Sequence, residues 1–159
     1  MLGLGMAGLL QFQPVNLAYR GDSLRVEAPL HGMMTEEIRD AVRGGYAYAV
    51  DFTVSIVVND RKSYRSVWRN SLAYDGAWKV NGTKVAPDSI AARMGAGAAV
   101  FPRLHFDPGD ALLVLATASI AGDSTFTRST GLPTSILWNY FLPKSASRWS
   151  YGPEGFLPR

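Results

Sequence analysis

Hydrophobic and polar residues alternate most regularly in the middle of the chain. From Tyr46 to Val58 every second residue is aromatic or β-branched, and the positions between them are mostly small or polar. Alternation with a period of two predicts a long β-strand with one buried face. Asn59-Asp60 predicts a turn, and the alternation resumes over residues 64–74. We therefore expect two long strands that pair as an antiparallel hairpin.

Shorter strand patterns lie on both sides of this hairpin. Residues 22–30 alternate as a first strand, and residues 78–85 form a small hairpin around Asn81-Gly82, a dipeptide favoured in two-residue turns. Residues 111–120 are an almost unbroken apolar run of strand length. Such a run predicts a strand that is covered on both faces or partnered by another chain. Residues 125–128 are its expected hairpin partner.

Two short helices are expected. Thr35 is a suitable N-cap for a helix that ends at Gly44-Gly45, and its apolar positions follow the helical spacing. Glu36 and Glu37 fall in the first turn, where the helix dipole stabilises negative charge, and this account is simpler than a pair of catalytic acids. Pro87 opens the second helix, which extends to about residue 94.

These elements predict a mainly β (α+β) fold: an antiparallel β-sandwich or half-barrel with two short helices at its edges. We expect one β-rich domain over residues 21–143, preceded by an export signal or tail (1–20) and followed by a turn-rich, flexible tail (144–159). Residues 133–142 suit either a helix or a strand. The expected core consists of Val26, Ile38, Val42, Val50, Phe52, Val54, Ile56, Trp68, Leu72, Val80, Leu113, Leu115 and Ile120.

Charge and cysteine content narrow the function classes. The 159-residue chain has no cysteine, which excludes disulfide scaffolds, thiolate zinc sites and thiol nucleophiles. Its net charge is only +3. The densest basic run comprises Arg61, Lys62, Arg65 and Arg69, and it is interrupted by Tyr64, Val67 and Trp68. This spacing favours a solvated strand face over a nucleic-acid footprint, with a membrane phosphate surface as an alternative.

The first ten residues carry no charge and match the length of a signal-peptide core. A basic segment before them is missing, and residues 16–18 are a poor cleavage site, so we interpret them as a clipped or weak export signal. The alternative is an apolar tail that is flexible or packs locally. We expect a periplasmic or envelope-associated protein, with a cytoplasmic location as the alternative.

Several residue patterns resemble catalytic or ligand motifs, and each has a simpler structural explanation. The glycines in residues 3–8 lack the preceding strand that a dinucleotide site requires. His105, Asp107 and Asp110 have a spacing that permits metal binding, but Pro108-Gly109 already accounts for the two aspartates as turn residues. The hairpin turn likewise explains the glycosylation pattern at residues 81–83.

No nucleophile elbow is present, and His31, in a strand-to-helix turn, has no paired carboxylate in sequence. We therefore predict no enzyme activity and no catalytic, cofactor or metal residue. An uncharacterised hydrolase is kept as a further alternative.

Aromatic residues are the more informative candidates. Six of them fall on strands that we expect to be adjacent, where core packing and cross-strand pairing are the first explanation: Tyr46, Tyr48, Tyr64, Trp68, Tyr74 and Trp78. The alternative is an exposed face for a peptide, a sugar or an acyl chain. The apolar segment 136–142 adds residue types that anchor interfaces. The candidate surface is therefore Tyr48, Trp68, Tyr74, Trp138, Tyr140 and Phe141, and we favour a protein partner or self-association over a small apolar or carbohydrate ligand.

The order of segments resembles a bacterial exported family that is classed as a domain of unknown function, some of whose members are encoded near sensor kinases. The resemblance covers about residues 22–142. It rests on Glu-Glu-Ile-x-x-Ala-x-x-Gly-Gly at 36–45, Tyr-x-Val-x-Phe-x-Val at 48–54, Tyr64-Arg65, Leu72-x-Tyr74-Asp75 with Trp78-x-Val80, and Leu132-Pro133. The segment Trp138–Phe141 departs from the pattern. The resemblance implies that this chain shares the fold of that family and is exported. The family has no known catalytic residues, so the resemblance assigns none to this chain.

Overall fold

The structure is a computed structural model that describes residues 10–121 and 143–159. Three predictions therefore lie outside the described residues: the apolar core of the export signal, the hairpin partner at 125–128, and the conformation of 133–142.

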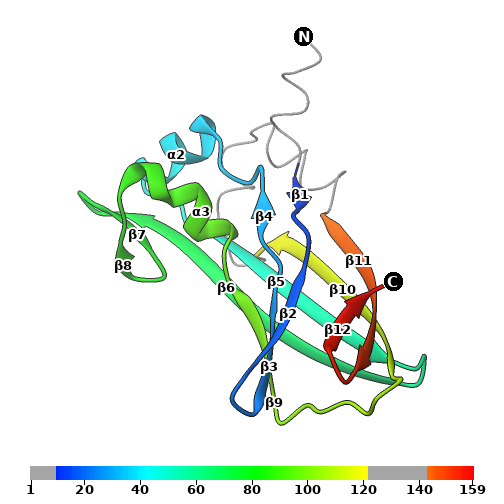
Figure 1. Cartoon of the computed structure of the whole chain (residues 1–159). Helices are drawn as coiled ribbons and strands as arrows, with labels where there is room; N and C mark the ends of the chain where they lie inside the picture. Colours follow the sequence, from blue (N-terminus) through cyan, green and yellow to red (C-terminus); the bar gives the residue numbers. More distant parts are fainter. Residues whose placement is uncertain (1–9, 122–142) are drawn as a thin grey trace.

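The fold is mainly β, as predicted, and its described strands pair antiparallel (Figure 1). A seven-stranded sheet, the main sheet, has the order β12-β11-β10-β5-β6-β7-β8. Its strands are β5 (Tyr48–Val58), β6 (Lys62–Tyr74), β7 (Trp78–Val80), β8 (Thr83–Lys84), β10 (Ala111–Ile120), β11 (Lys144–Gly152) and β12 (Gly155–Pro158).

A three-stranded sheet, the small sheet, has the order β2-β3-β9, and a short pair joins β1 to β4. The bounds are β1 (Gln11–Phe12), β2 (Asn16–Arg20), β3 (Ser23–Glu27), β4 (Leu30–His31) and β9 (Ala98–Pro102). The helical elements are α2 (Glu36–Arg43), η1 (Pro87–Ser89) and α3 (Ile90–Gly95). Figure 1 shows the helices at one end of the main sheet and the small sheet crossing its long strands.

The central hairpin forms as the alternation predicts. β5 pairs with β6 over its whole length, and this register places Phe52 opposite Trp68. Asn59 and Asp60 adopt positive φ angles of 51° and 56° in the turn. Asn81 and Gly82 do the same, at 53° and 79°, as a two-residue turn of the primed type requires. Both predicted turns are therefore confirmed.

One face of the main sheet, the inner face, holds the core. β5 contributes five buried residues at alternate positions, from Tyr48 to Ile56. The helices cover one half of this face, where Ile38, Val42 and Met94 pack in the same cluster as Tyr48 and Phe52. The small sheet covers the other half, where Leu24 and Val26 pack with Val54, Ile56 and Val114.

The two predicted helices are confirmed. The Thr35 hydroxyl accepts a hydrogen bond from the Ile38 N–H at 3.3 Å, and Ile38 and Val42 are buried. Glu36 and Glu37 lie in the first turn. The second helix begins as the 3-10 turn η1 at Pro87 and continues as α3, which buries Ile90 and Met94.

A buried amide joins α3 to the main sheet. The Asn70 side chain is 4% exposed. Its Nδ2 donates to the carbonyl oxygens of Met94 at 2.8 Å and Ala96 at 2.6 Å. Its Oδ1 accepts from Nδ2 of Asn81 at 2.9 Å. The end of α3 and the β7–β8 turn are thus held to the same position of β6.

The predicted domain limits are wrong at both ends. Residues 144–158 form β11 and β12 in the main sheet rather than a flexible tail, because Lys144 to Ser150 pair with β10. The Phe156 ring also stacks on Tyr19 and contacts Phe106 and Tyr151 in an aromatic cluster. Residues 16–20, which we assigned to the signal or tail, form β2 of the small sheet.

The predicted core is wrong at two positions of β10. The register with β5 places Leu112 and Val114 opposite Val58 and Ile56, so these two residues face the core. Leu113 is consequently half-buried and Leu115 is 36% exposed on the opposite face. Among the described residues β10 is therefore covered on one face only, which corrects the expectation of a strand covered on both.

Candidate functional site

The predicted aromatic surface does not form as one unit. Tyr48 is buried, and its hydroxyl donates to the carbonyl oxygen of Met33 at 3.0 Å. The Trp68 indole stacks on Phe52, with ring centroids 4.7 Å apart. Both rings therefore serve the core. Tyr74 is 38% exposed, whereas Trp138, Tyr140 and Phe141 lie outside the described residues.

A glycine explains why Trp68 turns inward. Gly97 has a φ of +130°, and a Cβ at this position would collide with the Trp68 indole. The missing side chain therefore makes room for the indole between β6 and the start of β9. The Trp68 Nε1 is buried, and no acceptor for it lies among the described residues.

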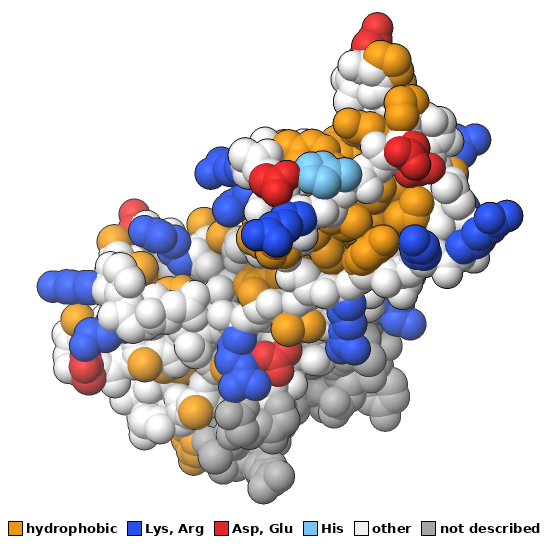
Figure 2. Space-filling model, turned by 90° about the horizontal axis from the view of Figure 1, so that it is seen from below, with side chains coloured by type: hydrophobic (Ala, Val, Ile, Leu, Met, Phe, Trp, Pro, Cys, Tyr) orange, Lys and Arg blue, Asp and Glu red, His pale blue; other side chains and the backbone are white. Residues whose placement is uncertain are grey.

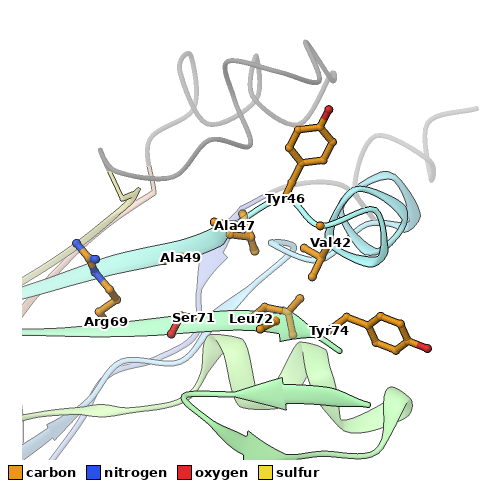
Figure 3. A pocket seen from close by; sticks show the side chains of 11 residues that line it. Val42, Tyr46, Ala47, Ala49, Arg69, Ser71, Leu72 and Tyr74 are labelled. Atoms are coloured by element: carbon orange, nitrogen blue, oxygen red, sulfur yellow. The ribbon is translucent and has the colours of Figure 1, made fainter. Parts of the chain in front are cut away.

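Tyr74 instead borders an open cleft at the end of the central hairpin (Figure 3). The cleft measures about 430 Å³ and lies where the C-terminal end of α2 meets the hairpin. Small residues form much of its lining: Ala47, Ala49, Ser71 and Ala73. Figure 3 shows Tyr46 and Tyr74 extending in different directions on the two sides of Val42. Tyr48 contributes to the cleft and Trp68 does not, so the predicted pocket forms only in part.

The charge beside this cleft is neutralised. Arg69 donates to both carboxylate oxygens of Asp51, from Nε at 2.6 Å and from Nη2 at 3.1 Å. The two residues are directly opposite each other on β6 and β5. A bidentate pair of this kind holds the guanidinium in place. The cleft is therefore suited to a neutral ligand.

The other face of the main sheet, the outer face, carries three of the exposed apolar residues. Val67 is 62%, Leu115 36% and Leu157 46% exposed. Directly opposite residues share a face, so the register places Arg65, Ser55, Leu115 and Ala146 in one row across four strands. Leu113 and Val57 lie in the next row. A shallow hollow of about 580 Å³ includes Leu113, Leu115 and Ala146.

The same face is basic. By strand parity, its charged residues are Arg65, Arg69, Lys79, Lys84, Lys144, Arg148 and the acid Asp51, with Arg159 at the border of the hollow. Arg69 is paired with Asp51, and Lys79 with Asp75. Arg65 and Arg148 lie beside apolar and hydroxyl side chains. Sequence reasoning missed this face because it assigned Leu113 and Leu115 to the core.

The two histidines lie in separate, exposed places, and one of them has a carboxylate partner. His105 Nε2 lies 2.7 Å from Oδ1 of Asp22, but both side chains are more than 60% exposed. Asp107 and Asp110 bond to each other within the predicted turn. His31 is exposed in β4. Within residues 10–121 and 143–159, no three histidine or acidic side chains are placed to hold a metal ion.

Comparison with known proteins finds no matching family model, no matching curated protein and no matching solved structure. The resemblance to an exported bacterial family therefore stays a prediction. None of the described helices is long and apolar enough to cross a membrane.

Proposed function

We propose that this chain is a non-catalytic binding domain that recognises a protein partner through the outer face of its main sheet. The observation that carries the proposal is the exposure of Val67, Leu115 and Leu157 on a face that has cations beside them. The helices and the small sheet pack on the inner face, and no described element packs on these rows of the outer face.

Physical reasoning favours a partner for such a face. A strand face that only meets water normally carries polar side chains, whereas contiguous exposed apolar residues mark interaction sites. Here Val57, Leu113, Leu115 and Ala146 are neighbours in two adjoining rows, while Val67 and Leu157 lie in other rows of the same face. Serine and threonine between the apolar residues add donors and acceptors, and the surrounding arginines resemble a polar rim. The cations favour a partner that presents acidic groups. The uncharged N-terminus adds the expectation that this partner lies in the bacterial envelope.

A site-specific photocrosslinker tests the proposal. Ala146 is exposed and lies next to Leu115 in the same row, so a photoreactive amino acid at this position reports on the outer face without replacing its leucines. Position Glu37 on α2 is the matched control, because it is exposed and belongs to another surface. We expect a discrete adduct in the native host from position 146 and not from 37. Adducts equal at both positions, or none, would contradict the proposal.

The cleft between Tyr46 and Tyr74 supports a second candidate function, the binding of a small apolar or carbohydrate ligand. Two exposed rings beside a floor of small residues are suited to stacking on a sugar or an acyl chain. Because Tyr74 contacts Trp78 with ring centroids 4.9 Å apart, tryptophan fluorescence reports on occupancy. The fluorescence is followed while an oligosaccharide or a fatty acid is added. Tyr46→Ala should weaken the binding of that ligand, and Tyr46→Phe should preserve it. Titrations without saturation would exclude this function.

A further inference from the structure

Most of β6 has no described strand hydrogen-bonded to the edge opposite β5, although β9 of the small sheet lies close to β6. The Ser71 carbonyl accepts from the Asn81 N–H, and the Ser71 N–H donates to the Asn81 side chain, both at 2.9 Å. Ser71 therefore directs its backbone groups away from β5. Backbone direction alternates along a strand, so Ser63, Arg65 and Val67 direct theirs to the same side. β7 pairs only with residues 72–74, and in the described parts of the chain the N–H groups of Ser63, Arg65 and Val67 meet no partner.

A groove lies along this edge. It measures about 420 Å³, and its lining includes Tyr64, Arg65, Val100, Arg103, Leu104 and His105. The loop after β9, which holds Arg103 to His105, runs along the bottom of Figure 1. Figure 2 views the molecule from this side and shows hydrophobic side chains gathered beside a histidine, with lysine, arginine and some acidic side chains around them. The groove thus combines apolar surface with positive charge.

The charges favour one kind of occupant. β6 and its turn carry Arg61, Lys62, Arg65 and Arg69, and the groove adds Arg103. Asp22 is engaged by His105, and Asp51 by Arg69. A second copy of the chain that paired along β6 would bring these cations together, which is destabilising for strands that lie opposite each other. An acidic strand would instead meet Arg65.

We propose that the open edge of β6 binds an acidic, extended peptide segment as an additional strand of the main sheet. Main-chain hydrogen bonds to Arg65 and Val67 would supply affinity, and alternate side chains would supply specificity. The acidic residues of the bound peptide would lie on the outer face opposite Arg65, and its apolar residues would point into the groove. This inference rests on the proposed function and specifies the partner's chemistry and its mode of binding.

Residue-resolved amide hydrogen exchange tests this binding mode. The probe is the peptide acetyl-Glu-Val-Glu-Val-Glu-Val-Glu-amide. At saturation the Arg65 and Val67 amides should exchange about tenfold more slowly, since they gain acceptors. The Tyr64 and Ser66 amides already face β5 and should change much less. Unchanged exchange at Arg65 and Val67 with this peptide at millimolar concentration would overturn the proposal.

Matched controls separate strand addition from charge attraction. The peptide with lysine in place of glutamate should not protect these amides, and a block version, Glu-Glu-Glu-Glu-Val-Val-Val, should bind more weakly because alternation is lost. Val67→Pro removes only an outward N–H, which an edge strand tolerates, and should weaken binding about tenfold. Val67→Ile keeps both the N–H and an apolar, β-branched side chain, and should remain within about threefold of wild type.

The outcomes also separate this inference from the proposed function. Equal protection by the lysine peptide, or wild-type affinity of Val67→Pro, would contradict strand addition. An adduct from position 146 together with unprotected edge amides would refute only the edge mode. The absence of that adduct together with protected amides would refute the outer face as the contact surface and leave the edge as the binding site.

Discussion

Successive side chains of β5 point alternately to the inner and the outer face of the main sheet, and the two faces have different surroundings. Phe52, Val54 and Ile56 are fully buried on the inner face, under helices or the small sheet. Thr53 and Ser55 point to the opposite side and are only partly covered. On the neighbouring strands the outer face adds exposed apolar residues that contribute little to the core. The buried contacts of the fold thus lie mainly on one face, and the other face is the one we propose for binding.

Substitutions on adjacent residues of β5 should show the largest difference between the faces. Phe52→Ala removes a fully buried ring that stacks on Trp68, and should lower the free energy of unfolding by about 3–5 kcal/mol. Thr53→Ala on the outer face should change it by less than about 0.5 kcal/mol. Urea denaturation of both variants makes the comparison. Similar losses for the two would show that the faces are not energetically distinct.

Substitution of Asn70 tests whether the inner face tolerates the loss of buried hydrogen bonds between β6 and α3. Asn70→Ala leaves the carbonyl oxygens of Met94 and Ala96 without their donor, and should cost about 1–3 kcal/mol of unfolding free energy. Ser119→Ala, on the exposed face of β10, is the matched control and should be nearly neutral. Thermal denaturation measures both. A neutral Asn70→Ala would show that the bridge from β6 to α3 is dispensable.

The aromatic cluster tests the placement of the C-terminal hairpin. Phe156→Ala removes ring contacts with Tyr19, Phe106 and Tyr151, and should destabilise the fold by about 1–2 kcal/mol because this side chain is only half-buried. Leu157→Ala on the exposed face should have little effect. If Phe156→Ala melts at the wild-type temperature, the hairpin contributes nothing to the core.

The smallest expected effect concerns pH. Burial, followed by the charges of Tyr151 and Asp22, raises the pKa of Tyr19 above 10.0. Because this pKa is raised, the stability that the neutral Tyr19 hydroxyl contributes is fully present below pH 10. It is lost as the pH rises through the pKa of Tyr19 in the folded state. Tyr19→Phe loses the hydrogen bond from the hydroxyl to the Leu104 carbonyl at 2.7 Å, so it should be slightly less stable at neutral pH. The difference from wild type should shrink above pH 10. A difference that is independent of pH would exclude titration of Tyr19.

Local patterns predicted much of this fold. The alternation in β5, the Asn81-Gly82 turn and the Thr35 cap each depend on residues close in sequence, and the structure has all three. The apolar run of β10 has no period of two, so sequence could not decide which leucines face inward. Only pairing with β5 decides it, because a shift of one residue exchanges the two faces.

Other features depend on contacts between distant segments. Residues 144–152 are rich in serine, and they become a strand because β10 offers an edge. Their alternation of Ser147, Trp149 and Tyr151 was a signal that the turn-rich composition obscured. The position of Trp68 depends on Gly97, and the open edge of β6 depends on where β7 stops pairing. The predicted aromatic surface failed at Tyr48 and Trp68 for this reason.

The central claim is that the apolar residues of the outer face serve binding rather than stability. It is tested most directly by the double variant Val67→Ser, Leu115→Ser with the photocrosslinker at position 146. We expect the unfolding free energy to stay within about 1 kcal/mol of wild type, since both side chains are exposed, while the adduct yield falls at least about tenfold. An unchanged adduct yield, or a loss of several kcal/mol in stability, would contradict the claim.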